Sequence, residues 1–158
     1  MHILVVMDPI EKLDLPKDTS VGFILSALKR EWTVSIGTVA DLYSLHNKVY
    51  TVSSSVVSDP EKVLSVTNRQ TNPLSNFDAV LMRVDPPVNR EYLHATHLLD
   101  LAEQDTLVLN NPRGVRFANE KAYALHFPDL TPYTRLSSNP QQVRSWLEAG
   151  DAPLIVKP

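Results

Sequence analysis

Short, continuously apolar segments separated by segments with helical spacing constrain this chain more than any other feature. Residues 3–7 read Ile-Leu-Val-Val-Met, an apolar and β-branched run typical of a strand that is covered on both faces. The pair Asp8-Pro9 ends this strand, because proline cannot donate to a ladder of backbone hydrogen bonds. Residues 18–20 then offer helix N-caps, and apolar side chains recur at helical spacing from Val21 to Leu28. A buried strand followed by an amphipathic helix favours an α/β fold.

The same alternation continues along the chain. Residues 33–36 and 77–82 predict two further strands, and a helix that begins near Asn89 leads to a strand at residues 106–109. Asparagine N-caps, two of them followed by proline, predict three more helices at Asn111, Asn119 and Asn139. Together these elements predict the α/β fold class, with an open, mainly parallel sheet and helices on both faces.

The middle of the chain is less regular. Residues 43–45 and 49–52 predict a hairpin that turns at residues 46–48. From 53 to 76 the chain is rich in Ser, Asn, Asp, Pro and Thr, and only residues 62–66 resemble a strand. We interpret the segment 53–76 as a surface excursion from the sheet.

The segment 119–158 supplies less than a domain. It contains two predicted helices and one apolar strand, residues 154–156, with no later element to cover that strand. We therefore predict a first domain over residues 1–118 and the truncated beginning of a second domain over residues 119–158.

Composition and charge exclude several classes of function. Fifteen Lys and Arg against eighteen Asp and Glu give a formal net charge of −3, so no basic field attracts nucleic acid or an anionic membrane surface. The N-terminus has neither the basic region of a signal peptide nor an apolar run long enough to span a membrane. The chain has no cysteine, which excludes disulfides, thiolate metal sites and a thiol nucleophile, and which fits a reducing cytoplasm.

The spacing of glycine and histidine excludes further sites. The four glycines are too far apart for the dinucleotide and P-loop motifs, whose glycines lie within a few residues of each other so that backbone amides can wrap phosphates. The pattern Glu91-x-x-His94 is half of a di-iron signature, but the other histidines are scattered, so we interpret it as helix surface.

Two loops lie where an open α/β sheet binds ligands, just beyond the carboxyl ends of its strands. One contains Asp8, and the other begins with Arg83 and contains Asp85. An arginine with two aspartates could receive the carboxylate and the ammonium of an amino-acid-like ligand. The structural alternative is that proline ends each strand and aspartate caps each turn, and the pattern favours neither interpretation.

Two lysines stand at unusual positions. Lys157 follows an apolar, buried-type strand, where an ammonium costs free energy unless an anion meets it. Lys121 lies in the first turn of a predicted helix, where a cation opposes the helix dipole. Both positions suit phosphate contacts, although a single lysine can also extend its ammonium to water.

A set of motifs, taken in order, is more specific than any of the single patterns above. These motifs are Val6-Met7-Asp8-Pro9, Lys17-Asp18-Thr19-Ser20, Asp41-Leu42-Tyr43, Leu81-Met82-Arg83-Val84-Asp85-Pro86-Pro87, Asn119-Glu120-Lys121 and Asp129-Leu130-Thr131-Pro132. Over the whole of residues 1–158 this set resembles bacterial glutathione synthetase. The resemblance implies a pre-ATP-grasp domain over residues 1–118, followed by the beginning of an ATP-grasp domain over residues 119–158.

The resemblance also implies a reaction. In this family ATP phosphorylates the cysteinyl carboxylate of γ-glutamylcysteine, and the glycine amine attacks the acyl phosphate to give glutathione. Mg²⁺, with Mn²⁺ as an alternative, offsets the charge on the phosphates. Carried over by motif position, the ATP-phosphate residues are Lys121 and Lys157, and the residues bordering the dipeptide are Asp8, Asp18, Ser20, Arg83 and Asp85.

Two departures from the family pattern qualify these expectations. Val84 stands where the family often has a basic residue, and Val88 where it often has an aromatic one, so we expect a less polar substrate loop. The nucleotide-covering loop and the metal ligands belong to sequence beyond residue 158 in this family. We therefore expect no catalytic and no metal-ligating residue within this segment, and we expect this chain alone to be inactive.

The resemblance further implies a cytoplasmic homo-oligomer. Two other interpretations stay open at this point. One is the N-terminal part of another ATP-grasp carboxylate-amine ligase, and the other is a non-catalytic, flavodoxin-like domain for binding or oligomerisation.

Overall fold

The computed structural model describes residues 1–119, 121–150 and 154–157. The chain divides into two compact units, Met1–Phe117 and Ala118–Pro158. No helix among the described residues has the length and apolar character needed to cross a membrane.

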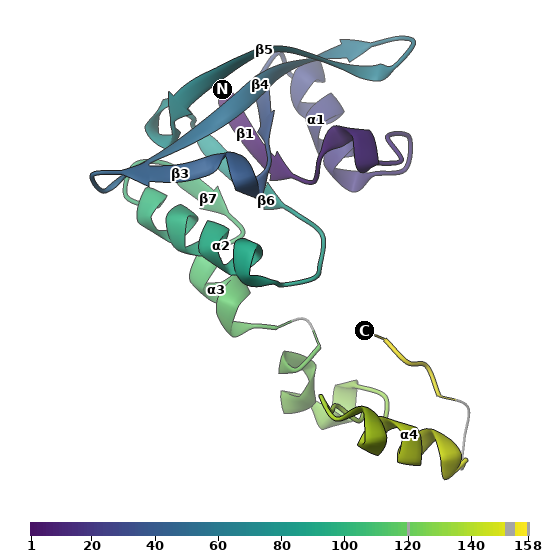
Figure 1. The fold of residues 1–158 in the computed structure, drawn as a ribbon. Helices are drawn as coiled ribbons and strands as arrows, with labels where there is room; N and C mark the ends of the chain where they lie inside the picture. The colour runs from purple at the N-terminus through teal and green to yellow at the C-terminus, as the bar shows by residue number, and fades with distance from the viewer. Residues whose placement is uncertain (120, 151–153, 158) are drawn as a thin grey trace. The chain divides into compact units, whose positions relative to one another are not determined.

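The first unit is built on one seven-stranded sheet (Figure 1). Strand β1 (His2–Met7) pairs in parallel with β2 (Thr33–Gly37) on one side and with β6 (Ala79–Arg83) on the other. The short strand β7 (Leu107–Leu109) continues the parallel arrangement beside β6. The predicted α/β class, with a parallel sheet at its centre, is confirmed.

Two helices connect the parallel strands in the predicted order. Helix α1 (Thr19–Lys29) joins β1 to β2, and helix α2 (Arg90–Ala102) joins β6 to β7. Each begins at its expected N-cap: the Asp18 carboxylate accepts from the Ser20 amide at 2.7 Å, and the Asn89 side chain accepts from the amide of the third residue beyond it at 2.9 Å. These caps satisfy amides that the first helical turn leaves unpaired.

The two helices cover opposite faces of the sheet. Leu4 and Val6 of β1 belong to a buried cluster with α2, whereas Val5 and its neighbours at odd positions belong to a second cluster with α1. This alternation follows from the two-residue repeat of a strand. The connection after β1 runs through α1 to β2 on one side of β1, and the connection after β6 runs through α2 to β7 on the other side. The carboxyl ends of β1 and β6 therefore form a topological switch point, the usual place for a ligand in such folds.

Residues 53–76 differ from the prediction. The expected hairpin is present as β3 (Leu42–Leu45) and the start of β4 (Lys48–Asp59), but β4 continues and pairs in antiparallel fashion with β5 (Val63–Pro73). The predicted surface excursion is therefore wrong, whereas the strand-like residues 62–66 coincide with the start of β5. The inward positions of the segment 53–76 include Ser53, which is 1% exposed, so a buried hydroxyl residue hides the apolar alternation that reveals a strand.

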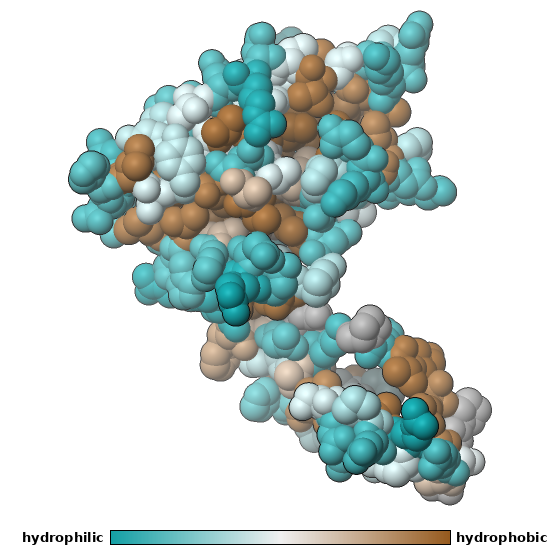
Figure 2. Space-filling model, in the orientation of Figure 1, coloured by the Kyte–Doolittle hydropathy of each residue, from teal (hydrophilic) through white to brown (hydrophobic). Residues whose placement is uncertain are grey.

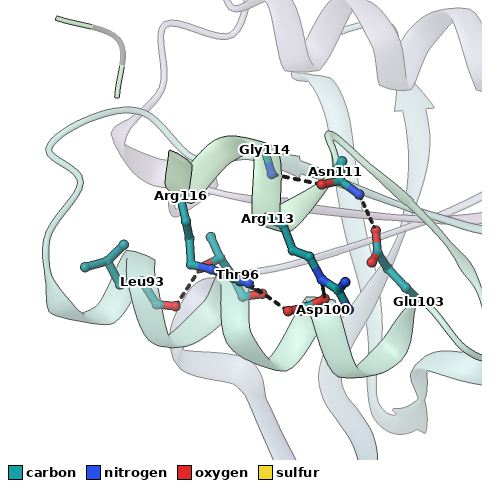
Figure 3. A network of polar contacts seen from close by, with 8 residues as sticks. All are labelled: Leu93, Thr96, Asp100, Glu103, Asn111, Arg113, Gly114 and Arg116. Atoms are coloured by element: carbon teal, nitrogen blue, oxygen red, sulfur yellow. Dashed lines mark hydrogen bonds and ion pairs between the residues drawn. The ribbon is translucent and has the colours of Figure 1, made fainter. Parts of the chain in front are cut away.

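Helix α3 (Pro112–Phe117) ends the first unit and is fastened to α2 by charged side chains (Figure 3). The Asp100 carboxylate accepts from Arg116 at 2.7 Å and from Arg113 at 2.8 Å, and Arg116 also donates to the carbonyl of Thr96 at 3.0 Å. The hydrogen bonds from Arg116 and then Arg113 hold the pKa of Asp100 below its ordinary value.

The second unit contains helices but, among its described residues, no strand. Helix α4 (Pro140–Glu148) forms as predicted, with Asn139 as N-cap and with Gly150 at a φ of +66° beyond its end. The helix predicted after Asn119 is reduced to the 3₁₀ helix Tyr123–His126. A second 3₁₀ helix follows at Pro128–Leu130.

The predicted strand at residues 154–156 is wrong. These residues and Lys157 are exposed and have no regular structure. A β-strand needs a partner for its backbone groups, and none of the described residues pairs with this segment.

Candidate functional site

The carboxyl ends of β1 and β6 bring together the two loops that the sequence analysis selected. Asp8 follows β1 directly, Arg83 is the last residue of β6, and Asp85 lies two residues further on. The Asp85 amide donates to Oδ2 of Asp8 at 2.9 Å, which ties the two loops together. With Thr19, which contacts Arg83, we name these residues the carboxyl-edge cluster.

Arg83 crosses from the sheet to the start of α1. Its Nη2 donates to Oγ1 of Thr19 at 2.7 Å, and its guanidinium carbon lies 5.5 Å from the centre of the Phe23 ring. Its Nε is buried and has no hydrogen-bond partner among the described residues. A buried donor without an acceptor is unfavourable, and this unpaired group lies at the switch point of the sheet.

Asp18 and Ser20 have structural roles in the same region. One oxygen of Asp18 accepts from the amides of Ser20 at 2.7 Å and Val21 at 3.2 Å. Ser20 is only 5% exposed, so its hydroxyl is not presented to the surface. The substrate-binding role that the resemblance implies for these two residues stays a prediction.

A pocket of about 370 Å³ lies beside Asp8, at the carboxyl ends of β1 and β2. We name it the β1–β5 pocket, because it extends across the sheet from β1 to β5. Its walls are Met7, Asp8, Pro9, Ile10, Glu11, Ile36, Gly37, Thr38, Ala40, Asp41, Val52, Ser54, Val66 and Arg69. Its volume is in the range of small-molecule sites.

Asp41 fixes the position of Arg69 in this pocket. Oδ2 of Asp41 accepts from the Thr38 amide at 2.8 Å and from the Thr38 hydroxyl at 2.7 Å, while Oδ1 accepts from Nη2 of Arg69 at 2.6 Å. The Asp41 side chain is only 13% exposed. The sequence analysis missed Arg69, because it placed this residue in a surface excursion. The Thr-x-x-Asp pattern of residues 38–41, typical of a capping box, was a signal that could have identified Asp41.

The second unit has a larger pocket of about 590 Å³. Both predicted phosphate lysines, Lys121 and Lys157, line it, and we name it the lysine pocket. Arg135 also lines it, with its guanidinium carbon 5.2 Å from the Tyr133 ring centre and 5.6 Å from that of Trp146. No aspartate or glutamate is among the described residues of its wall, and most of the others are apolar. An anion with an apolar body suits this combination.

No three His, Asp or Glu side chains gather into a possible metal site in the part of the chain that the structure describes.

Comparisons with known proteins agree on one family. The family model described as prokaryotic glutathione synthetase, N-terminal domain, matches residues 1–116. Similar proteins named glutathione synthetase include those of Vibrio vulnificus strain YJ016, at 39% identity, and Salmonella typhimurium, at 37%. The protein of that name from Escherichia coli strain K12 is 34% identical. Each alignment covers 98% of this chain and 49%, 50% and 49% of the respective relative. The chain thus spans about half the length of the curated relatives it matches.

Proposed function

The chain belongs to the prokaryotic glutathione synthetase family, and we propose that it forms the N-terminal half of an ATP-dependent carboxylate-amine ligase. The proposed reaction joins γ-glutamylcysteine to glycine. Besides the family, the observation that supports the proposal is the carboxyl-edge cluster, which brings Arg83, Asp8 and Asp85 together at the switch point of the sheet.

In this proposal the carboxyl-edge cluster binds the dipeptide. Arg83 offers a guanidinium, already oriented by Thr19 and Phe23, to a carboxylate of the substrate. Asp8 and Asp85 border the same site and favour the ammonium group. Asp18 and Ser20 hold the start of α1, and through it Thr19, in place.

The lysine pocket is proposed to bind ATP through Lys121 and Lys157. The terminal phosphoryl group of ATP passes to the cysteinyl carboxylate, with ADP as leaving group. The glycine amine then attacks the acyl carbon, the carbon–oxygen bond to phosphate breaks, and inorganic phosphate leaves with the electron pair and takes up the proton that the amine releases. The two ammonium groups would offset the negative charge of the polyphosphate. Mg²⁺, or Mn²⁺ in its place, would supply further charge neutralisation when bound.

We also propose that residues 1–118 form a pre-ATP-grasp domain and that residues 119–158 begin an ATP-grasp domain. The exposed apolar side chains of the second unit, visible as brown atoms in Figure 2, support this division, because an incomplete domain leaves such side chains uncovered. A cytoplasmic homo-oligomer completes the proposal. The lack of cysteine supports that compartment.

Val84, one of the two departures from the family pattern, does not argue against this substrate. Its side chain is half-buried and packs against the core cluster under α2. In this position the valine side chain contributes to the packing at the base of the loop.

The test is a ligase assay of the complete gene product that carries this chain. We expect ATP-dependent release of phosphate with γ-glutamylcysteine and glycine, and much less with other carboxylate acceptors. Replacing Arg83 by methionine removes a charge-assisted hydrogen bond and should raise the KM for the dipeptide about tenfold or more, with the KM for ATP unchanged.

The matched control is Arg30→Met, which changes an exposed arginine at the end of α1. Activity with a different acceptor would favour another ATP-grasp ligase, and an inactive gene product would favour a non-catalytic binding domain. A defect of Arg83→Met restricted to ATP would move Arg83 to the nucleotide side.

A further inference from the structure

Strand β4 turns two buried hydroxyl groups towards the face of the sheet that α2 covers. Val49 belongs to the buried cluster with α2, and Thr51 and Ser53 follow it at two-residue intervals, so all three lie on the same face. Thr51 and Ser53 are 0% and 1% exposed. The β1–β5 pocket lies on the other face, because its β4 residues are Val52 and Ser54. The two hydroxyls therefore face a part of the interior that the candidate site does not use.

Neither hydroxyl has a partner within the described part of the chain. Oγ1 of Thr51 and Oγ of Ser53 are buried and make no hydrogen bond with any described residue. A buried hydroxyl without a partner is unfavourable, and most such groups in native proteins bond to protein or to ordered water. The two hydroxyls cannot bond to each other, because side chains two positions apart on a strand are separated by about 6.8 Å. A bridging water spans about 5.6 Å between two polar atoms, which suits this separation.

Gly37 leaves room beside these hydroxyls. Strands β2 and β4 run antiparallel with Ile36 opposite Ser54, so the next residues, Gly37 and Ser53, are also opposite each other. A Cβ added to Gly37 would lie 3.2 Å from Oγ1 of Thr51, and no other side-chain atom would be nearer to it. The glycine thus leaves a recess of about the size of a methyl group, close to the roughly 30 Å³ that one water molecule occupies in the liquid. We name it the Gly37 recess.

A third polar group belongs to the same layer. Asn72 of β5 is opposite Thr51 in the β4–β5 ladder, and opposite side chains of an antiparallel pair point to the same face. Nδ2 of Asn72 is buried and has no hydrogen-bond partner among the described residues either. An amide nitrogen only donates, whereas a hydroxyl both donates and accepts. A water that accepts from Asn72 and donates to the two hydroxyls makes about three hydrogen bonds, the usual number for a buried water.

We propose that the Gly37 recess binds one internal water molecule, held by the hydroxyls of Thr51 and Ser53 and by the amide of Asn72. The three partners are uncharged, so they suit a neutral ligand better than an ion. The water joins β4 to the outer strand β5 on the face that α2 covers. This site belongs to the fold of the first unit and does not depend on the proposed reaction.

A crystal structure of the 158-residue chain tests the site directly. We expect electron density for one water within about 3.2 Å of Oγ1 of Thr51, Oγ of Ser53 and Nδ2 of Asn72. The Gly37→Ala variant places a methyl group in the recess, so its structure should lack this water. A wild-type structure without a water that bonds to these three groups would overturn the inference, and so would a water that persists in Gly37→Ala.

Stability distinguishes a bound water from hydroxyls that have no partner. Thr51→Val keeps the shape of the side chain and removes the hydroxyl. With the water in place, this change removes one of its hydrogen bonds and should raise the equilibrium constant of unfolding about fivefold. Without the water, it removes an unpaired buried hydroxyl, and a lowered or unchanged constant would overturn the inference. Urea denaturation measures the constant, and Thr67→Val, at an exposed position of β5, is the control.

A double variant shows whether the two hydroxyls hold the same water. Ser53→Ala alone should also raise the equilibrium constant of unfolding. In the double variant Thr51→Val/Ser53→Ala the loss of stability should be smaller than the sum of the two single losses, because the first change already releases the shared water. Additive losses would mean that the hydroxyls act separately and would overturn the inference. The control for Ser53→Ala is Ser58→Ala, at an exposed position of β4. Ligase activity of the complete gene product decides the proposed function independently.

Discussion

The two units of this chain use the same local signals and reach different degrees of order. Both begin helices with asparagine or aspartate caps, and both have apolar residues at helical spacing. The first unit encloses two buried clusters, whereas no described residue of the second unit is buried. Several of the second unit's largest apolar side chains are more than 80% exposed, namely Leu130, Tyr133 and Ile155. Caps and spacing therefore determine where a helix starts, but burial depends on a second surface for the helix to pack on.

The largest expected effect tests this comparison with one substitution in each unit. Leu99 of α2 is 0% exposed, so Leu99→Ala should lower the free energy of unfolding by about 2–5 kcal/mol, from lost transfer energy and a new cavity. Leu147 of α4 is 47% exposed, and Leu147→Ala should cost less than about 0.5 kcal/mol. Urea denaturation of the two variants measures both values.

The same pair can contradict the comparison. A cost for Leu147→Ala close to that of Leu99→Ala would show that the second unit has a core of its own. A small loss of unfolding free energy in both variants would show that the first unit tolerates a cavity at its centre. That result would contradict the close packing of its buried clusters.

The next largest expected effect tests whether a residue of the second unit contacts ATP. In the complete gene product, Lys157→Ala should raise the KM for ATP about tenfold to a hundredfold while leaving the fold intact, because it removes a charged phosphate contact rather than a packed group. Steady-state kinetics with ATP and with γ-glutamylcysteine varied in turn measure the effect. Arg144→Ala, an exposed residue of α4, is the control. Unchanged ATP kinetics in Lys157→Ala would refute its assignment.

The comparison also explains what the sequence could and could not predict. Strands β1 and β6 and the caps Asp18, Asn89 and Asn139 were predictable, because their signals lie within a few residues of each other. Strands β4 and β5 were predictable only in part: residues 49–52 and 62–66 resembled strands, but the rest of both strands is polar, and the buried position of Ser53 breaks the apolar alternation. The prediction of a strand at residues 154–156 failed for a related reason, because its apolar pattern required a partner strand.

The residues of the candidate site also divide into those that have a local sequence signal and those that do not. Asp8 and Arg83 were predictable, because they stand at the ends of clearly apolar strands. Arg69 entered a pocket only through the pairing of β5 with β4, so no local pattern could place it beside Asp41.

A smaller effect is expected where α3 joins α2, at the end of the first unit. Hydrogen bonds from Arg116 and Arg113 lower the pKa of Asp100 below its ordinary value of 3.8. The charged form is thus favoured by folding, so this contribution is present above that pH and is lost as the pH falls through the lowered pKa. Asp100→Asn should reduce stability at pH 7 by less than Leu99→Ala does, and it should flatten the loss of stability between pH 5 and pH 2.5.

Urea denaturation across that pH range measures the effect. The control is Asp105→Asn, an exposed aspartate in the turn after α2. A wild-type chain and an Asp100→Asn variant with the same acid dependence would show that the contacts drawn in Figure 3 contribute nothing that titrates with this carboxyl.

The smallest effect concerns the opposite end of β1 from the carboxyl-edge cluster. The His2 ring packs against Phe77, with ring centres 4.5 Å apart, and its Nε2 lies 2.9 Å from the Ser35 hydroxyl. Burial lowers the pKa of His2 from 6.5, and the nearby Asp78 carboxylate opposes this only in part. Folding therefore favours the neutral ring. This contribution is complete above pH 6.5 and is lost as the pH falls through the lowered pKa.

His2→Gln should remove that part of the pH dependence, and denaturation of the wild type and the variant between pH 8 and pH 5 measures the difference. Gln keeps a polar group near Ser35 but cannot titrate, so the two pH profiles should converge at low pH and separate at high pH. Profiles that stay parallel would mean that folding leaves the pKa of His2 unchanged, as it would for a ring that titrates from its solvent-exposed side. Because His2 starts the central strand of the first unit, a pH effect there would appear in the cooperative unfolding of that unit and leave helix α4 of the second unit unaffected.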